Sequence, residues 1–214
     1  MKDIIICGAG GFGREVACLI NIVNMKFPMW NIVGFTDSDE KLWGTSNRYG
    51  NILGDDSIIE QWNSAINVVI AIGNPQIVKK IVNSIHNPYV SFPNIIHPDF
   101  NCVDKKSFSI GKGNIIQGGC SVSCDVCLGD FNVFNGSVVF GHDDKVGNFN
   151  SFMPDIRVSG EVSIGDCNFF GVGSIILQQI KIGNNIRLGA GSVLMTKPKD
   201  GNLYMGVPAK KIEL

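Results

Sequence analysis

The chain has 214 residues, of which 44% are hydrophobic and 17% are charged, and its formal net charge is −1. This length allows one large or two small domains, and the scattered basic residues argue against a nucleic-acid-binding surface. No apolar run is long enough to span a membrane, and the N-terminus lacks the order of a signal peptide. Seven cysteines without a disulfide-like framework fit a reducing compartment, so we expect a cytoplasmic protein that contacts no membrane.

A glycine turn between a strand and a helix is the first predicted feature. Residues 3–7 are apolar and predict a strand, and residues 14–24 carry an apolar face that predicts a helix. Between them Gly8, Gly10 and Gly13 satisfy the pattern G-x-G-x-x-G. Unpaired backbone N–H groups and the helix dipole face such a turn, which therefore predicts an anion-binding site. A tight turn without a ligand is the alternative interpretation.

Two further strands are predicted to end at the same crevice. Residues 32–35 predict a strand that leads to Asp37, at the position where an acidic residue meets a ribose or base in a Rossmann-like fold. Residues 68–72 predict a strand that ends at Gly73 and Asn74, followed by a helix over residues 76–84. Residues 39–56 are polar and without a period, so we expect a loop there.

A six-residue repeat dominates the rest of the chain. Every sixth residue from Ile110 to Leu194 is large and apolar, which is typical of a repeat architecture. Glycine and asparagine recur with a period of eighteen: Gly111, Gly129, Gly147, Gly165 and Gly183; Asn114, Asn132, Asn150 and Asn168. Three hexads per coil predict a triangular parallel β-helix of about five coils. We expect the glycines at the corners to supply positive φ.

His142 is the histidine that falls within the hexads, and it follows the inward position Phe140 by two residues. It is therefore expected to point outward near a corner, where an ordinary surface histidine is the alternative interpretation. Asp143 and Asp144 follow it and either could orient the ring, while Gly160, one coil further on, would leave room for a substrate. Imidazole accepts protons near neutrality, which suits a general base.

The remaining histidines and the clustered cysteines carry weaker signals. We interpret His97, in an Ile-His-Pro junction outside the repeat, as structural and His86 as a surface residue. Cys120, Cys124 and Cys127 are spaced closely enough for zinc, but no fourth ligand is evident and packing of small residues is favoured. One histidine in the hexads is too few for a β-helical carbonic anhydrase, which needs three. A nicotinamide-dependent oxidoreductase is disfavoured because the chain after about residue 95 is repeat.

The hexads, the Gly-His-Asp stretch at residues 141–143, and the closing segments 188–193 and 206–210 resemble the left-handed β-helix acyltransferases. The sialic acid O-acetyltransferase and nucleotide-sugar N-acetyltransferase group is the most similar. The resemblance implies a Rossmann-like nucleotide-sugar-binding domain at residues 1–93 and an all-β left-handed parallel β-helix at residues 94–214. It also implies acetyl-CoA as co-substrate, no metal, and a homotrimer whose neighbouring chain covers the reaction site.

The resemblance also implies roles for individual residues. His142 is the expected general base, Asp143 its carboxylate partner in place of the usual glutamate, with Asp144 as substitute, and Asn135 lies near the acceptor amine. The residues expected to bind the nucleotide sugar are Gly8, Gly10, Gly11, Gly13, Asp37, Gly73 and Asn74. Those expected to bind acetyl-CoA are Ser151, Val172, Gly173, Ala190, Gly191 and Lys210.

We therefore expect an enzyme that transfers an acetyl group from acetyl-CoA to the amine of a nucleotide-linked amino sugar. O-acetylation of a sialic acid or related sugar is the alternative within enzymes. A non-enzymatic scaffold whose crevice binds a nucleotide is the alternative outside them.

Overall fold

A computed structural model describes residues 1–213, which divide into two compact units, Met1–Pro98 and a second unit that begins at Asp99. The sequence placed its boundary after residue 93, a few residues earlier. No helix among the described residues has both the length and the apolar character needed to cross a membrane.

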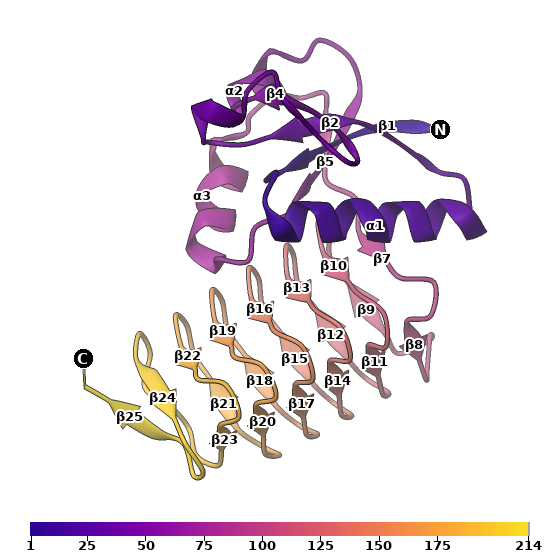
Figure 1. Cartoon of the computed structure of the whole chain (residues 1–214). Helices are drawn as coiled ribbons and strands as arrows, with labels where there is room; N and C mark the ends of the chain where they lie inside the picture. The colour runs from indigo at the N-terminus through magenta and orange to yellow at the C-terminus, as the bar shows by residue number, and fades with distance from the viewer. Residues whose placement is uncertain (214) are drawn as a thin grey trace. The chain divides into compact units, whose positions relative to one another are not determined.

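The first unit is a mostly parallel six-stranded sheet with helices in its connections (Figure 1). Its strands run in the order β3-β4-β2-β1-β5-β6, and β3 is antiparallel to β4. Their bounds are β1 Lys2–Cys7, β2 Trp30–Thr36, β3 Ser46–Asn47, β4 Gly50–Gly54, β5 Ile66–Ile70 and β6 Val90–Ser91. β1 lies between β2 and β5, and its residues Ile4, Ile5 and Ile6 are 0% exposed. Complete burial explains the continuous apolar run, because a central parallel strand is covered on both faces.

The helices of this unit are α1 Gly11–Lys26, the 3-10 turn η1 Glu40–Leu42, α2 Ser57–Gln61 and α3 Pro75–Ser84. α1 buries Val16, Leu19, Ile20 and Val23, as its apolar face predicted. The expectation of a loop over residues 39–56 was wrong, because η1, β3 and β4 lie there. These strands are short and contain glycine and polar residues, so they lack the alternating pattern by which a strand is recognised in sequence. β4 pairs with β2 on one side and with β3 on the other.

The second unit is a three-sided parallel β-helix, as the hexads predicted. Successive coils stack with a register of eighteen residues, for example Val146 opposite Ile164 and Phe152 opposite Phe170. Figure 1 shows the coils following one another from β9 to β23.

The strands of the β-helix form three sheets. One sheet contains β10 Ile115–Ile116, β13 Val133–Phe134, β16 Ser151–Phe152, β19 Phe169–Phe170, β22 Arg187–Leu188, β24 Leu203–Met205 and β25 Lys210–Ile212. The second contains β8 Asn101–Cys102, β11 Ser121–Val122, β14 Val139–Phe140, β17 Arg157–Val158, β20 Ile175–Ile176 and β23 Val193–Leu194. The third contains β9 Ser109–Ile110, β12 Cys127–Leu128, β15 Lys145–Val146, β18 Ser163–Ile164 and β21 Lys181–Ile182. The short strand β7 Ile95–Ile96 belongs to the first unit.

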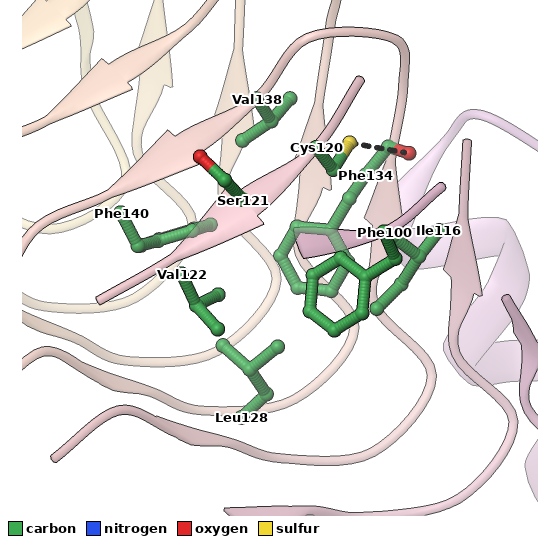
Figure 2. A pocket seen from close by; sticks show the side chains of 9 residues that line it. All are labelled: Phe100, Ile116, Cys120, Ser121, Val122, Leu128, Phe134, Val138 and Phe140. Atoms are coloured by element: carbon green, nitrogen blue, oxygen red, sulfur yellow. Dashed lines mark hydrogen bonds between the residues drawn. The ribbon is translucent and has the colours of Figure 1, made fainter. Parts of the chain in front are cut away.

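Apolar columns fill the interior of the helix. Phe134, Phe152 and Phe170 stack with ring centroids 5.1 Å and 4.7 Å apart, and the rings of Phe134 and Phe140 meet edge to face. At the first coils the side chains leave a cavity of about 10 Å³. Figure 2 shows its apolar lining, with the Cys120 thiol directed at the carbonyl of Phe134.

The role expected for the periodic glycines was wrong. Left-handed backbone at the corners is supplied largely by other residues, such as Asp143 with φ 61° and Glu161 with φ 61°. The periodic glycines are instead places of close approach between coils. A Cβ on Gly129 would lie 2.5 Å from the carbonyl oxygen of Gly147, so no side chain fits there.

Buried asparagines tie the coils together. Asn114, Asn132, Asn150 and Asn168 are 0% exposed and stack in one column. The Nδ2 of Asn150 donates to Asn132 Oδ1 at 3.0 Å and to the Gly165 carbonyl at 2.9 Å, and its Oδ1 accepts from the backbone N–H of Asn168 at 2.9 Å. Each amide thus satisfies backbone groups that the narrow core would otherwise leave unpaired.

Candidate active site

His142 lies at the corner between β14 and β15, where the chain leaves one sheet of the helix for the next. Its Nδ1 is 2.8 Å from Asp143 Oδ2, and the two side chains are 55% and 57% exposed. The corner is fixed on both sides: Asp143 donates its N–H to the Cys124 carbonyl at 3.1 Å, and the His142 carbonyl accepts from Glu161 at 2.8 Å. The imidazole therefore projects outward from a rigid backbone.

The ring of His142 lies over Gly160 of the following coil. A Cβ built on Gly160 would be 2.6 Å from Nε2 and 2.7 Å from Cε1 of the imidazole. The expectation that Gly160 leaves room for a substrate is therefore corrected, because the space is filled by the histidine itself. Asp143 on one ring nitrogen and Gly160 beneath the other side fix the orientation of the ring.

The carboxylate partner of the imidazole is Asp143. Its hydrogen bond and charge raise the pKa of His142 above the ordinary value, with smaller contributions from Glu161 and Asp144. A carboxylate on Nδ1 holds that nitrogen protonated in the neutral ring and leaves Nε2 as the basic atom. Asp144 turns inward instead: it is 0% exposed, and its Oδ1 accepts from the Val162 N–H at 2.8 Å.

Asn135 lies on the turn that follows β13. It is 9% exposed, and its Nδ2 donates to the Met153 sulfur at 3.8 Å. The amide is thus held against the next coil by a weak acceptor. Its expected role near an acceptor amine stays a prediction.

A hollow of about 340 Å³ opens beside the His142 corner. It is lined by Asp143, Lys145, Glu161 and Ser163, which combine three charged side chains with a hydroxyl. Sequence reasoning missed Lys145, Glu161 and Ser163. Their signal is the eighteen-residue register, which stacks Asp143 on Glu161 and Lys145 on Ser163.

The glycine turn of the first unit borders a crevice of about 320 Å³. Gly8, Gly10, Gly11, Gly13 and Asp37 all line it, as the sequence suggested. Among the described residues, none has an atom within 4 Å of a Cβ built on Gly10 or on Gly11, so the backbone there is open to a ligand. Gly13 is different, since its Cβ would be 1.9 Å from the Gly8 carbonyl oxygen and its role is close packing of helix on strand.

The acidic residues of the crevice are largely engaged with the protein. Asp37 accepts from the Ala9 N–H at 2.9 Å and from the Asp39 N–H at 3.0 Å, so it holds the glycine turn in place. Sequence reasoning missed Asp56, which lines the crevice and accepts from the Thr36 hydroxyl at 2.7 Å. It follows β4, a strand that the sequence did not reveal.

Gly73 and Asn74 do not line the crevice. The side chain of Asn74 caps α3, accepting from the N–H groups of Gln76 at 3.0 Å and Ile77 at 3.3 Å. A capping role explains an asparagine at this position without a ligand. We therefore leave both residues out of the proposed nucleotide site.

The residues expected to bind acetyl-CoA lie mostly on the surface. Val172 is 48% exposed, and its carbonyl accepts from Gly191 on the next coil at 2.8 Å. Ala190 and Lys210 are exposed, and Gly173 and Gly191 have φ 66° and 64°. Ser151 is only 1% exposed, so the surface gives a cofactor no access to its side chain and we drop it from the proposed site.

The three clustered cysteines do not converge. Burial raises the pKa of the Cys120 thiol to about 11, and this thiol donates to the Asn135 carbonyl at 3.0 Å. Cys127 is exposed. Over residues 1–213, no three His, Cys, Asp or Glu side chains are grouped so that they could hold a metal ion.

Comparisons with known proteins match both units. Residues 3–85 match the family described as the PglD N-terminal domain. No curated protein matches the sequence of this chain. The acetyltransferase domain of PglB from Neisseria gonorrhoeae is 26% identical, with a TM-score of 0.87 over 99% of this chain and 100% of that one.

Two other solved structures extend this comparison. PerB from Caulobacter crescentus, solved with CoA and GDP-perosamine, is 26% identical with a TM-score of 0.84 over 100% of this chain and 98% of that one. WeeI from Acinetobacter baumannii has the same fold, at 24% identity and a TM-score of 0.87 over 99% of this chain and 100% of that one. The expected fold class, a Rossmann-like domain followed by a left-handed parallel β-helix, is confirmed. Residues 3–85 therefore carry a PglD-type N-terminal domain, and the chain as a whole is similar to solved acetyltransferases with the same two-unit fold.

Proposed function

We propose that the protein transfers an acetyl group from acetyl-CoA to the amine of a nucleotide-linked amino sugar, with His142 as general base. The observation that carries this proposal is the exposed His142–Asp143 pair, held over Gly160 on a β-helix that follows a glycine-turn crevice. PglB has been solved with acetyl-CoA, and PerB with CoA and a GDP-linked sugar. Both ligands match the two sites expected here.

The task of the protein in this reaction is to move a proton from the amine to the leaving thiolate. The amine nitrogen attacks the thioester carbonyl, so a C–N bond forms while the C–S bond to CoA breaks. Nε2 of His142 takes the proton that the amine loses, and it can return a proton to the departing CoA thiolate. The charge on Asp143 stabilises the imidazolium in between, which is the reason for its place on Nδ1.

The nucleotide part of the sugar would bind at the open backbone of Gly10 and Gly11. Their N–H groups lie at the start of α1, where the helix dipole favours the negative charge of a diphosphate. Acetyl-CoA would lie along Val172, Gly173, Ala190 and Gly191, with Lys210 near a phosphate.

We further propose a cytoplasmic homotrimer. His142 and Asp143 are more than half exposed in a single chain, which leaves the reaction open to water. The hexads run without an interrupting loop from residue 110 to 194, so a neighbouring copy has to supply the second wall. Free thiols at seven cysteines suit a reducing compartment. Light scattering tests the assembly: a monomer at micromolar concentration with full activity would refute it.

An assay of CoA thiol release tests the activity. The purified protein is given acetyl-CoA with UDP-, dTDP- and GDP-linked amino sugars, and with free sialic acid as the hydroxyl acceptor. We expect release with an amino sugar and a loss of about 10²- to 10⁴-fold in His142→Ala. Release with sialic acid alone would favour O-acetylation. No release with any acceptor, together with no thermal shift by acetyl-CoA, would favour a binding scaffold.

A further inference from the structure

Asp144 is a carboxylate in an otherwise apolar column of the β-helix core. The residues stacked with it at intervals of eighteen are Val126, Val162 and Ile180, which are 0%, 0% and 5% exposed. Asp144 itself is 0% exposed, and its Oδ2 is buried without a hydrogen-bond partner. A buried carboxylate with an unpaired oxygen is costly to the fold, and a valine would avoid that cost.

The buried asparagines show which hydrogen bonds a polar residue can make at the position directly before a strand of the β-helix, which is also the position of Asp144. Asn132, like Asp144, follows a residue with left-handed backbone and precedes a two-residue strand. Its Oδ1 accepts from the N–H of Asn150, eighteen residues on, and its Nδ2 donates to the Gly147 carbonyl, fifteen residues on. Asp144 Oδ1 makes the first of these bonds, to Val162, but an ionised Oδ2 has no hydrogen for the second. An asparagine at this position could keep the bond to Val162 without burying a negative charge.

The buried carboxylate belongs to the same turn as the reactive corner. Asp144 lies two residues after His142 and directly before the first residue of β15, so it shares the backbone turn that carries His142. The titratable groups that act on His142 are Asp143 and Asp144 on its own turn and Glu161 on the next coil. The preceding coil contributes the corner of Cys124 and Asp125, and Asp125 is exposed. Of the carboxylates on these turns, Asp144 is the one removed from water.

We propose that Asp144 is a positioning residue whose buried negative charge acts through His142, stabilising the imidazolium that forms when the acceptor amine loses its proton, at the expense of fold stability. This inference rests on the proposed acetyl transfer. Charges in a low-dielectric interior act more strongly on a neighbour than exposed charges do, because water screens them less. Burial raises the pKa of Asp144 to about 6, while the hydrogen bond from Val162 and the charge of His142 lower it, so the group is largely ionised at neutral pH.

The variant Asp144→Asn tests both halves of the proposal. Because the folded pKa of Asp144 is raised from 3.8 to about 6, the fold loses stability as pH rises from the first value through the second. Asp144→Asn is therefore expected to melt at a higher temperature than wild type at pH 8, and this difference should shrink steadily as pH falls from about 6 toward 3.8. The His142 ring, followed by NMR without substrate, should titrate at lower pH than in wild type. The kcat/KM should fall about threefold to tenfold, with its acid limb moved to lower pH.

Asp125→Asn is the matched control, since it removes one exposed carboxylate from the same corner of the preceding coil. It should leave the melting curve, the His142 titration and kcat/KM nearly unchanged. An unchanged His142 titration in Asp144→Asn, or a lower melting temperature at pH 8, would overturn the proposal. Should Asp144→Asn not fold, Asp144→Val reproduces the neighbouring coils and must show the same lower His142 titration. A wild type that acetylates no sugar refutes the proposed function alone, because melting and titration need no substrate.

Discussion

The imidazole of His142 takes the space that a side chain on Gly160 would fill, with only 2.6 Å between Nε2 and a Cβ built there. The two residues lie on successive coils at corresponding positions, eighteen residues apart. The helix register therefore sets the orientation of the proposed base.

Gly160→Ala is expected to inactivate the protein without unfolding it. The added methyl group displaces the imidazole, and an ångström of misplacement costs about 10²-fold in rate. The clash falls on the end of a side chain that is 55% exposed, so stability should change little. Steady-state kinetics and a melting curve check this. Gly136→Ala is the control, because Gly136 precedes a left-handed residue in the same way and its Cβ would meet only the Gly118 carbonyl, at 3.6 Å. Equal losses in both variants would contradict the explanation.

The pH dependence of activity should follow His142. Its hydrogen bond to Asp143 raises its pKa, so kcat/KM is expected to rise with pH through a value above about 6.5. Asp143→Asn should move this acid limb to lower pH and reduce kcat/KM about tenfold to a hundredfold. The substitution fits the backbone, because asparagine adopts the left-handed φ of 61° readily. An acid limb that stays in place would assign the titration to another group.

The contact between His142 and Asp143 should stabilise the fold at low pH and not at high pH. A histidine with a raised folded pKa stabilises the fold below its unfolded pKa, and this contribution is lost as pH rises through the raised value. Asp143→Asn should therefore lower the melting temperature relative to wild type at pH 5.5 and leave it unchanged at pH 9. Because both side chains are more than half exposed, the difference at pH 5.5 should be small and should shrink in high salt.

The repeat could be predicted from the sequence because large apolar residues recur at the same six-residue spacing many times. Every inward position from Ile110 to Leu194 obeys the same packing constraint, so single exceptions do not hide the period. The corner glycines were misinterpreted for a physical reason: close approach and positive φ both select glycine, and only coordinates distinguish them. Gly129 shows the first cause, and the left-handed Asp143 shows that a corner can do without glycine.

The site was harder to predict from the sequence because it depends on the direction in which each side chain points. The sequence placed His142 at a corner and gave Asp143 as its partner with Asp144 as a substitute, since both are carboxylates beside it. The turn decides between them, sending Asp143 outward to the ring and Asp144 inward to Val162. Asn74 was misplaced for a similar reason, because a helix cap and a ligand-binding amide look alike in sequence.

The buried asparagine column should be a major source of stability in the β-helix. Asn150→Ala leaves the Gly165 carbonyl and the Asn168 N–H without their partners inside the core. Each buried unpaired group costs about 1–3 kcal/mol, so we expect a loss of about 3–5 kcal/mol in the free energy of unfolding. Denaturant unfolding measures this. Asn148→Ala is the control two residues away: the Asn148 side chain accepts from the Asp130 N–H at 2.8 Å and donates to Asp166 Oδ1 at 3.2 Å, but it is partly exposed, so water can replace it. A loss there as large as in Asn150→Ala would refute the argument from burial.

The crevice glycines should separate ligand binding from folding. No atom of residues 1–213 lies within 4 Å of a Cβ built on Gly11, whereas a Cβ on Gly13 would lie 1.9 Å from the Gly8 carbonyl oxygen. Gly13→Ala is therefore expected to destabilise the first unit, by about 2–4 kcal/mol, because the start of α1 must shift away from β1. Gly11→Ala should keep the melting temperature of wild type and raise the KM for the nucleotide sugar about tenfold, since the methyl group would block close approach of the diphosphate. The KM for acetyl-CoA should not change in Gly11→Ala. A wild-type KM for the nucleotide sugar in this variant would show that the open backbone at the start of α1 is not where the nucleotide binds.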